Sequence, residues 1–305
     1  MKRFLTLLAA ALFAALPYAS AVERIEPSAK TESRDYRLSG FRKLDISWVY
    51  QVELTQSGKY SVRIEAPENL MEYLDVRVVD GTLKLGLKEK FTSRRIDMGG
   101  SRNAVRAYIS MPSLNELEMS GAAKLNASGQ FNAHREFKLD LSGATQAMGL
   151  SIKADEAEVD CSGASRFELN GNFDKLECDL SGAAKGTLAG NAKRTEIDLS
   201  GAAKLSQNGN IGTLTMEASG SASYTLNGNI DAFTLDASGA AAINTVDAPA
   251  ERVRVSLSGA AKASVDVQKE FSVHLTGAAG CRYRAGNKLR ITSQSVGRGA
   301  SLNKI

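Results

Sequence analysis

The sequence predicts an all-β protein in which one chain winds into a single-stranded parallel β-solenoid with coils of about 19 residues. Three observations predict this fold. A short Ser-Gly-Ala motif recurs at nearly constant spacing, and polar and apolar residues alternate before each copy. Every copy also contains a glycine at the point where the chain would turn.

The repeat is the tetrad Ser-Gly-Ala/Ser-x, with Thr once in place of Ser. Its nine copies begin at Ser120, Ser142, Ser162, Ser181, Ser200, Ser219, Ser238, Ser258 and Thr276. The intervals run from 18 to 22 residues, and four of the eight are 19. A β-propeller is the alternative, but its blades need about 40 residues or more. The uniform short interval therefore favours a solenoid.

The residues around each copy predict two strands per coil. If the Ser or Thr is position zero, positions −3 and −1 are apolar in all nine copies, whereas −4 and −2 are polar. This period of two indicates a strand with one buried face. Gly at +1 predicts a sharp bend with positive φ, and the small residue at +2 is expected to let neighbouring coils approach closely. Apolar residues at +5 and +7, such as Phe167 and Leu169, predict a shorter second strand, and an Asn-Gly-Asn turn follows in several coils.

The three cysteines fit the same register. Cys161 and Cys178 fall on inward positions, one coil and two residues apart. That offset separates their Cα atoms by roughly 8 Å, whereas a disulfide needs less than about 7 Å. Cys281 falls at the inward position +5. We therefore expect free, buried thiols.

The N-terminus predicts export through the general secretory route. Lys2 and Arg3 precede an apolar run that ends near Leu16, and Ala19-Ser20-Ala21 resembles a cleavage site. We interpret residues 1–21 as a signal peptide, with an N-terminal membrane anchor as the alternative. The apolar run is too short to span a bilayer and no second run follows, so no transmembrane segment is expected in the mature chain. In a bacterium this places the protein in the periplasm or at the cell surface.

The remaining chain divides into four predicted parts. Residues 22–35 are expected to be a flexible segment, 36–112 irregular β coils that cap one end, 113–287 the regular repeat, and 288–305 a C-terminal strand and cap. Within 36–112, Leu44-Asp45-Ile46-Ser47 matches positions −3 to 0, although Trp48 replaces the glycine. Residues 68–73 are expected to form a single helical turn, and Asp80-Gly81 a turn into a strand.

These N-terminal motifs carry a family resemblance. The runs Gly40-Phe41-Arg42-Lys43-Leu44-Asp45-Ile46, Val52-Glu53-Leu54-Thr55-Gln56 and Asp80-Gly81-Thr82-Leu83-Lys84-Leu85, followed by the Ser-Gly-Ala repeats, resemble the head-GIN domain family, also called auto-transporter adhesins. The resemblance covers nearly all of the chain after residue 35. It implies a right-handed parallel β-helix in an exported bacterial protein, and it brings no established catalytic residues.

Stacking of the coils would turn two outward positions into charged columns. Position −2 predicts an acidic column and position +4 a basic one. The acidic column contains Asp140, Asp160, Asp179, Asp198 and Asp236 with Glu118 and Glu217; the basic column contains Lys185 and Lys204 with Lys124, Arg166 and Lys262. Like charges about 5 Å apart repel by about 1 kcal/mol in bulk water. We expect a solvated face on which the basic column compensates the acidic one across the bend; a bound cation such as Ca²⁺ is the alternative.

Composition argues against several classes of function. A formal net charge of +4 is small for 305 residues and does not favour nucleic-acid binding. The only histidines, His134 and His274, lie in no zinc motif, and no His is placed to activate the serine column. We expect no cofactor, no metal site and no catalytic residues.

The sequence therefore favours an exported, non-catalytic β-helix protein that acts as an adhesin-like or envelope interaction module. Its partner would be an envelope glycan or another protein. Two alternatives stay open: a polysaccharide-active β-helix enzyme, whose paired carboxylates would need a cleft, and a structural protein of envelope homeostasis.

Overall fold

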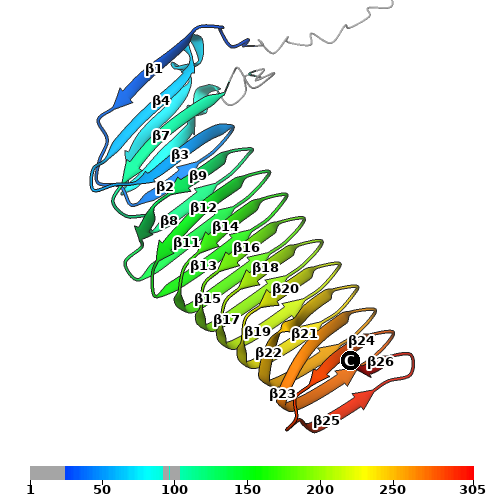
Figure 1. Cartoon of the computed structure of the whole chain (residues 1–305). Helices are drawn as coiled ribbons and strands as arrows, with labels where there is room; N and C mark the ends of the chain where they lie inside the picture. Colours follow the sequence, from blue (N-terminus) through cyan, green and yellow to red (C-terminus); the bar gives the residue numbers. More distant parts are fainter. Residues whose placement is uncertain (1–24, 92–95, 97–103) are drawn as a thin grey trace, which may run out of the picture.

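The computed structural model describes residues 25–91, 96 and 104–305; the predicted signal peptide lies outside this range. The described chain is a parallel β-solenoid, as the repeat predicted. Its coils stack into a rod with the N-terminal strands at one end and the C-terminus at the other (Figure 1). Leu180 pairs with Leu199 one coil further on, so equivalent positions of successive coils lie side by side.

Each regular coil contributes two strands that flank the glycine corner, the Ser-Gly-Ala segment between them. We call the outward side of the strands before the corner the first face. Its strands are β2 (Lys43–Ile46), β8 (Glu116–Met119), β11 (Glu136–Leu141), β13 (Glu156–Cys161), β15 (Phe173–Leu180), β17 (Ala192–Leu199), β19 (Ile211–Ala218) and β21 (Ile230–Ala237).

The outward side of the strands after the corner is the second face. Its strands are β3 (Tyr50–Gln56), β9 (Lys124–Ser128), β12 (Gln146–Lys153), β14 (Arg166–Asn170), β16 (Lys185–Ala189), β18 (Lys204–Asn208) and β20 (Ser223–Asn227). Short β10 (Gln130–Asn132) pairs with the end of β12. Further along the rod, β22 (Ala242–Leu257) and β23 (Lys262–Leu275) each run through the second strand of one coil and the first of the next.

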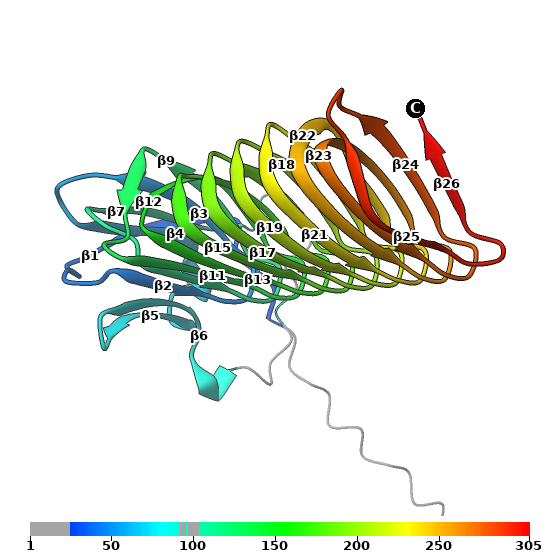
Figure 2. The ribbon, with the colours of Figure 1, turned by 90° about the horizontal axis from the view of Figure 1, so that it is seen from below.

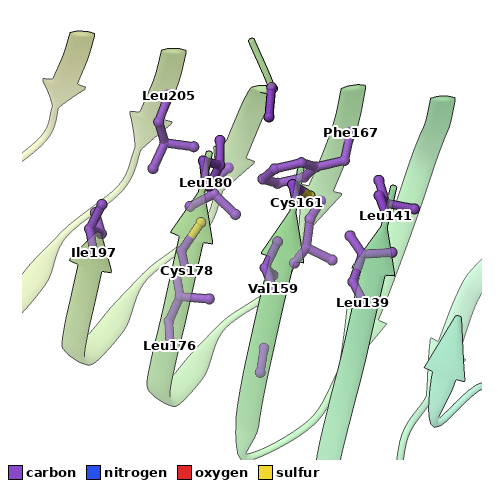
Figure 3. Close-up of a cluster of buried hydrophobic side chains, with 14 of the residues drawn as sticks. Leu139, Leu141, Val159, Cys161, Phe167, Leu176, Cys178, Leu180, Ile197 and Leu205 are labelled. Carbon is purple, nitrogen blue, oxygen red and sulfur yellow. The ribbon is translucent and has the colours of Figure 1, made fainter. Parts of the chain in front are cut away.

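The inward side chains form one continuous hydrophobic core. Positions −3 and −1 are buried along the repeat, and columns such as Val159, Cys178 and Ile197 pair in register through parallel strands. Figure 3 shows these side chains packed with Phe167 and Leu205 from the strands after the corner. A single coil has too little apolar surface to fold alone, so each coil depends on its neighbours.

The glycine corner explains why position +1 never varies in the regular repeat. Gly201 has φ 68°, and a Cβ at this position would lie 2.8 Å from the carbonyl oxygen of Gly182 in the preceding coil. Both the backbone angle and the close approach therefore exclude a side chain. The small residue at +2, Ala202, is exposed, and its expected role in close approach stays a prediction; the buried small residue is Ala203 at +3.

Trp48 is the exception at this corner, and its place in the rod explains it. It keeps the positive φ of the column, 68°, and its carbonyl accepts a hydrogen bond from Ala122 in the next coil. It belongs to the first coil, so no earlier glycine corner lies where its side chain projects. At this position only the positive φ of Trp48 costs free energy, since no neighbouring corner backbone would be displaced by its side chain.

The N-terminal part combines one coil that departs from the repeat motif with antiparallel strands. β2 and β3 form the first coil, as predicted, but β4 (Ser61–Pro67) lies antiparallel between β1 (Thr31–Tyr36) and β7 (Val105–Met111). The expected flexible segment over 22–35 is therefore wrong at its C-terminal end, because residues 31–35 pair with the edge of β4. The single helical turn is present as η1 (Glu68–Leu70).

A hairpin completes this end of the rod. β5 (Leu74–Val79) and β6 (Thr82–Leu87) are antiparallel and joined by the Asp80-Gly81 turn, and η2 (Glu89–Phe91) follows. β6 pairs with β2, and Figure 2 shows the hairpin beside the first coils. These strands cover the β2 edge, which would otherwise be open to pairing with other chains.

The last described residues form two strands rather than the single one expected over 288–305. β25 (Arg290–Val296) pairs with β23, and β26 (Ser301–Lys304) pairs with β24 (Gly280–Ala285). They make one more coil, whose inward residues Ile291 and Val296 are partly exposed. The four domain boundaries themselves stay predictions.

All three cysteines are buried and unpaired, as their register predicted. Cys161 pairs laterally with Leu180 and Cys178 with Val159, which confirms the diagonal offset. Burial raises the pKa of the Cys161 and Cys281 thiols to about 12, and that of Cys178 also rises through burial. Since the thiolate is the reactive form, these groups are chemically quiet in the folded protein.

We predict that Gly201→Ala destabilises the fold by about 1–3 kcal/mol, because alanine must adopt a left-handed angle and displace the neighbouring backbone. Urea unfolding followed by circular dichroism measures the change. The matched control is Ala202→Ser, which copies the natural Ser221 of the next coil and should change stability by less than about 0.5 kcal/mol. Equal stability of Gly201→Ala and wild type would contradict the close approach.

We predict that no thiol of the native protein reacts with an aromatic disulfide reagent, whereas all three react after unfolding in denaturant. Mass spectrometry after alkylation should recover Cys161 and Cys178 as separate thiols. A Cys161–Cys178 bridge in the native protein would show that the coil register is wrong.

Candidate functional site

The acidic column predicted at position −2 forms on the first face. Asp140 pairs with Asp160, Asp160 with Asp179, and Asp179 with Asp198. Glu217 and Asp236 continue the column, and Ser256 ends its acidic part. Alternation within each strand points these carboxylates outward while the residues on either side enter the core.

The column lines one wall of an open groove of about 640 Å³. The serines at position zero form the other wall, because they follow the acids by two residues at the glycine corner. The groove is lined by Asp140, Asp160, Asp179, Asp198, Glu217 and Asp236 with Ser162, Ser181, Ser200, Ser219, Ser238, Ser256 and Ser258. Each coil thus contributes one carboxylate and one hydroxyl, and both groups recur along the groove at the coil repeat of about 4.8 Å.

The groove carboxylates have no ion pair or hydrogen bond to other side chains within the described part of the chain. The expected compensation across the bend is therefore wrong. Cations on the first face pair instead with acids at position −4: Lys138 lies 2.6 Å from Glu158, and Lys175 pairs with Glu177. At the N-terminal end of the column, Lys84 lies 2.7 Å from Asp45.

The lack of partners changes the ionisation of the groove. Partial burial, followed by the charges of neighbouring acids, raises the pKa of Asp160 and Asp179 above their usual value. Burial and Glu116 do the same for Glu118. Burial is the larger cause of these pKa shifts, and the negative charge that the column concentrates adds to it.

The basic column forms on the second face. Arg166 pairs with Lys185, and Lys185 with Lys204, so three cations stack on successive coils. All three are exposed, and none has an ion pair within the described residues. Lys124 is separated from Arg166 by Gln146, and Lys262 from Lys204 by Ser223 and Ala242.

The serine hydroxyls are the part of the site that sequence reasoning missed. In the described repeat only the hydroxyls of Ser142 and Thr276 donate to the preceding coil. The hydroxyls of Ser162, Ser181 and Ser200 remain available to a ligand. Their position directly after the acids was the signal that could have revealed this second wall.

Two negative findings limit the chemistry of the described residues. No group of three or more His, Cys, Asp or Glu side chains has an arrangement that could hold a metal ion. No helix among them is long and apolar enough to cross a membrane. The groove thus combines rows of carboxylates and hydroxyls with apolar residues at position −1, which are Cys161, Leu180, Leu199, Ala218 and Ala237.

We predict that Asp179→Asn raises the free energy of unfolding by about 1 kcal/mol at pH 7, because it removes repulsion from Asp160 and Asp198. A raised pKa in the folded state means that the native protein binds its proton before the unfolded chain does. The repulsion that lowers the free energy of unfolding of the wild type is thus lost as pH falls through the raised pKa toward the usual 3.8. The difference in the free energy of unfolding between Asp179→Asn and wild type should shrink over the same pH range.

The control for this series is Asp174→Asn. Asp174 lies outside the groove and 2.7 Å from Lys193, so its removal should bring no gain in stability. Urea unfolding from pH 4 to pH 8 measures both variants, and added salt should reduce the Asp179→Asn gain by screening. A gain that does not change with pH or salt would mean that repulsion is not its cause.

Comparison with known protein families identifies one family whose model matches most of this chain. The family described as "Putative auto-transporter adhesin, head GIN domain" matches residues 40–206 and 184–286. No curated protein matches the chain.

Three similar solved structures come from Parabacteroides. A "putative adhesin" from P. distasonis has 17% identity and a TM-score of 0.52, covering 93% of this chain and 100% of its own. A "putative adhesin" from P. merdae has 16% identity and a TM-score of 0.50, covering 92% and 99%. A "putative lipid binding protein" from P. distasonis has 20% identity and a TM-score of 0.49, covering 93% and 100%. At these identities the likeness concerns the fold alone, and the chain belongs to the head GIN domain family by its match to the family model.

Proposed function

We propose that this protein is an exported, non-catalytic, adhesin-like binding module of the periplasm or cell surface. Its acidic groove, lined by Asp140, Asp160, Asp179, Asp198 and Asp236, would bind cationic groups on an envelope partner. Membership of the head GIN family, described as adhesins, supports the general role. The structure supplies the surface that could perform it.

The observation that carries the proposal is the row of unpaired carboxylates. Successive acids lie on adjacent coils in register, so the groove repeats one chemical group at a constant step. Exposed ion pairs contribute only about 0.2–1 kcal/mol each. Several in line act together, because the first contact raises the effective concentration of the next. A partner with regularly spaced cations therefore fits this groove better than a small ligand does.

The rigidity of the rod favours such binding. Each groove acid from Asp160 to Asp198 lies on a strand that pairs with both neighbouring coils, and each serine follows directly at the hydrogen-bonded glycine corner. The unbound groove already has its binding geometry, so little conformational entropy is lost when a partner docks. A rigid, repetitive surface is suited to adhesion.

The enzyme alternative finds less support. The acids of the groove are equivalent from coil to coil, whereas a glycosidase needs two carboxylates in different environments, one protonated and one ionised. Asp160 and Asp179 both have a raised pKa from the same causes, so no such division of roles arises between them.

We predict that the protein binds oligosaccharides with free amino groups on an envelope-glycan array, without binding their N-acetylated forms and without releasing reducing sugar. Asp160→Asn/Asp179→Asn/Asp198→Asn should weaken this binding about tenfold, by removing three charge contacts.

The matched control is Asp155→Asn/Asp174→Asn/Asp231→Asn. It changes the net charge equally but at the opposite end of the first-face strands, outside the groove. Release of reducing sugar would favour the enzyme. Absence of binding to any glycan or envelope protein would favour a purely structural role.

A further inference from the structure

We infer that the partner of the acidic groove is the basic column of a second copy of this chain, so that the protein acts in homotypic adhesion. This inference rests on the proposed function and names the occupant of the groove. It is carried by three features: complementary charge, a shared repeat, and the absence of a partner for either column among the residues that the structure describes.

The two faces carry opposite charge. The first-face strands β13, β15, β17, β19 and β21 contain eleven acidic and three basic residues. The second-face strands β14, β16, β18 and β20 contain three basic residues and one acidic residue, Glu168. Two copies can therefore meet first face to second face with attraction, whereas like faces would repel.

The spacing of the columns matches because both belong to the same coils. Asp160, Asp179 and Asp198 occupy three successive levels, and Arg166, Lys185 and Lys204 occupy the same three levels beyond the corner. When two rods lie side by side, each cation of one copy can face an acid of the other, and the match does not drift along the rod. An unrelated partner would have this period only by coincidence.

Neither column can satisfy the other within one molecule. The glycine corner separates them, and the described residues contain no ion pair between an Asp of the groove and Arg166, Lys185 or Lys204. A second copy removes this restriction. Long lysine and arginine side chains can also enter the groove and donate to the free hydroxyls of the serine wall.

The size of the faces fits a weak, reversible contact. The acidic part of the column runs through seven levels from Glu118 to Asp236. At about 4.8 Å a step, with strands of about 20 Å, such a face offers roughly 600 Å². Stable interfaces bury about 800 Å² per partner, and weak or transient ones less. The contact is therefore of the weak, reversible size, and repetition along opposed surfaces makes it adhesive.

Because the contact joins different faces, the pair still presents one free face of each sign, the second face of one copy and the first face of the other. Such heterologous contacts extend into rings or open arrays rather than stopping at a dimer. This property provides the test, since variants that lack one face can only terminate an assembly.

The experiment uses two variants in sedimentation velocity at low salt, with circular dichroism to confirm their fold. The groove variant is Asp160→Asn/Asp179→Asn/Asp198→Asn, and the column variant is Arg166→Gln/Lys185→Gln/Lys204→Gln. Wild type should form concentration-dependent oligomers that dissociate at high salt. Each variant alone should be monomeric. An equimolar mixture should form a complex of two chains, because one variant keeps the basic column and the other keeps the groove.

Two outcomes would overturn the inference: a wild type that stays monomeric at low salt, or a mixture of the two variants that stays monomeric. If self-association fails while the groove variant still loses binding on the glycan array, the proposed function stands and its partner is a glycan. If the two variants associate only when mixed, the homotypic partner is established even when no binding is detected on the glycan array.

Discussion

The structure depends on one contact, which is the hydrogen bond between successive glycine corners. In each regular coil the N–H of the residue at +2 donates to the carbonyl of the preceding corner glycine at 2.7 Å, as Ala183 does to Gly163 and Ala202 to Gly182. The contact requires that the backbones approach without an intervening Cβ, which only glycine at +1 allows. It holds each coil directly above the last, and the columns follow from this alignment.

The same alignment produces both the stability and the charge of the protein. Inward columns give a core with no break along the rod, in which even the thiols are shielded from solvent. Outward columns bring like charges onto adjacent strands, where antiparallel or staggered pairing would separate them. The fold tolerates the acidic column because its members are solvated, and part of the cost appears as raised pKa values at Asp160 and Asp179.

The two ends of the rod show how a repeat is started and finished. At the N-terminal end, β6 pairs with β2 and β7 with β3, and Trp48 can occupy the corner because no earlier glycine corner of the described chain lies against it. This arrangement relieves the requirement for glycine and closes an edge in one step. The departure from the repeat at Trp48 thus marks a position where the neighbouring glycine corner is missing.

The sequence by itself determined the coil length, the inward and outward residues, the register of the cysteines and the existence of both charged columns. It could do so because a solenoid converts spacing along the chain directly into contact in space; the Asp160–Asp179 pairing needs nothing more than an interval of 19 residues. Only the tertiary structure decided how the strands outside the repeat pair and which charged side chains form ion pairs. The antiparallel place of β1 depends on a partner about 30 residues away, for which no period exists. Whether Lys185 could reach the groove depended on the angle of the corner between the faces, and Lys138 with Glu158 showed that cations pair along their own face, where the distance is shorter.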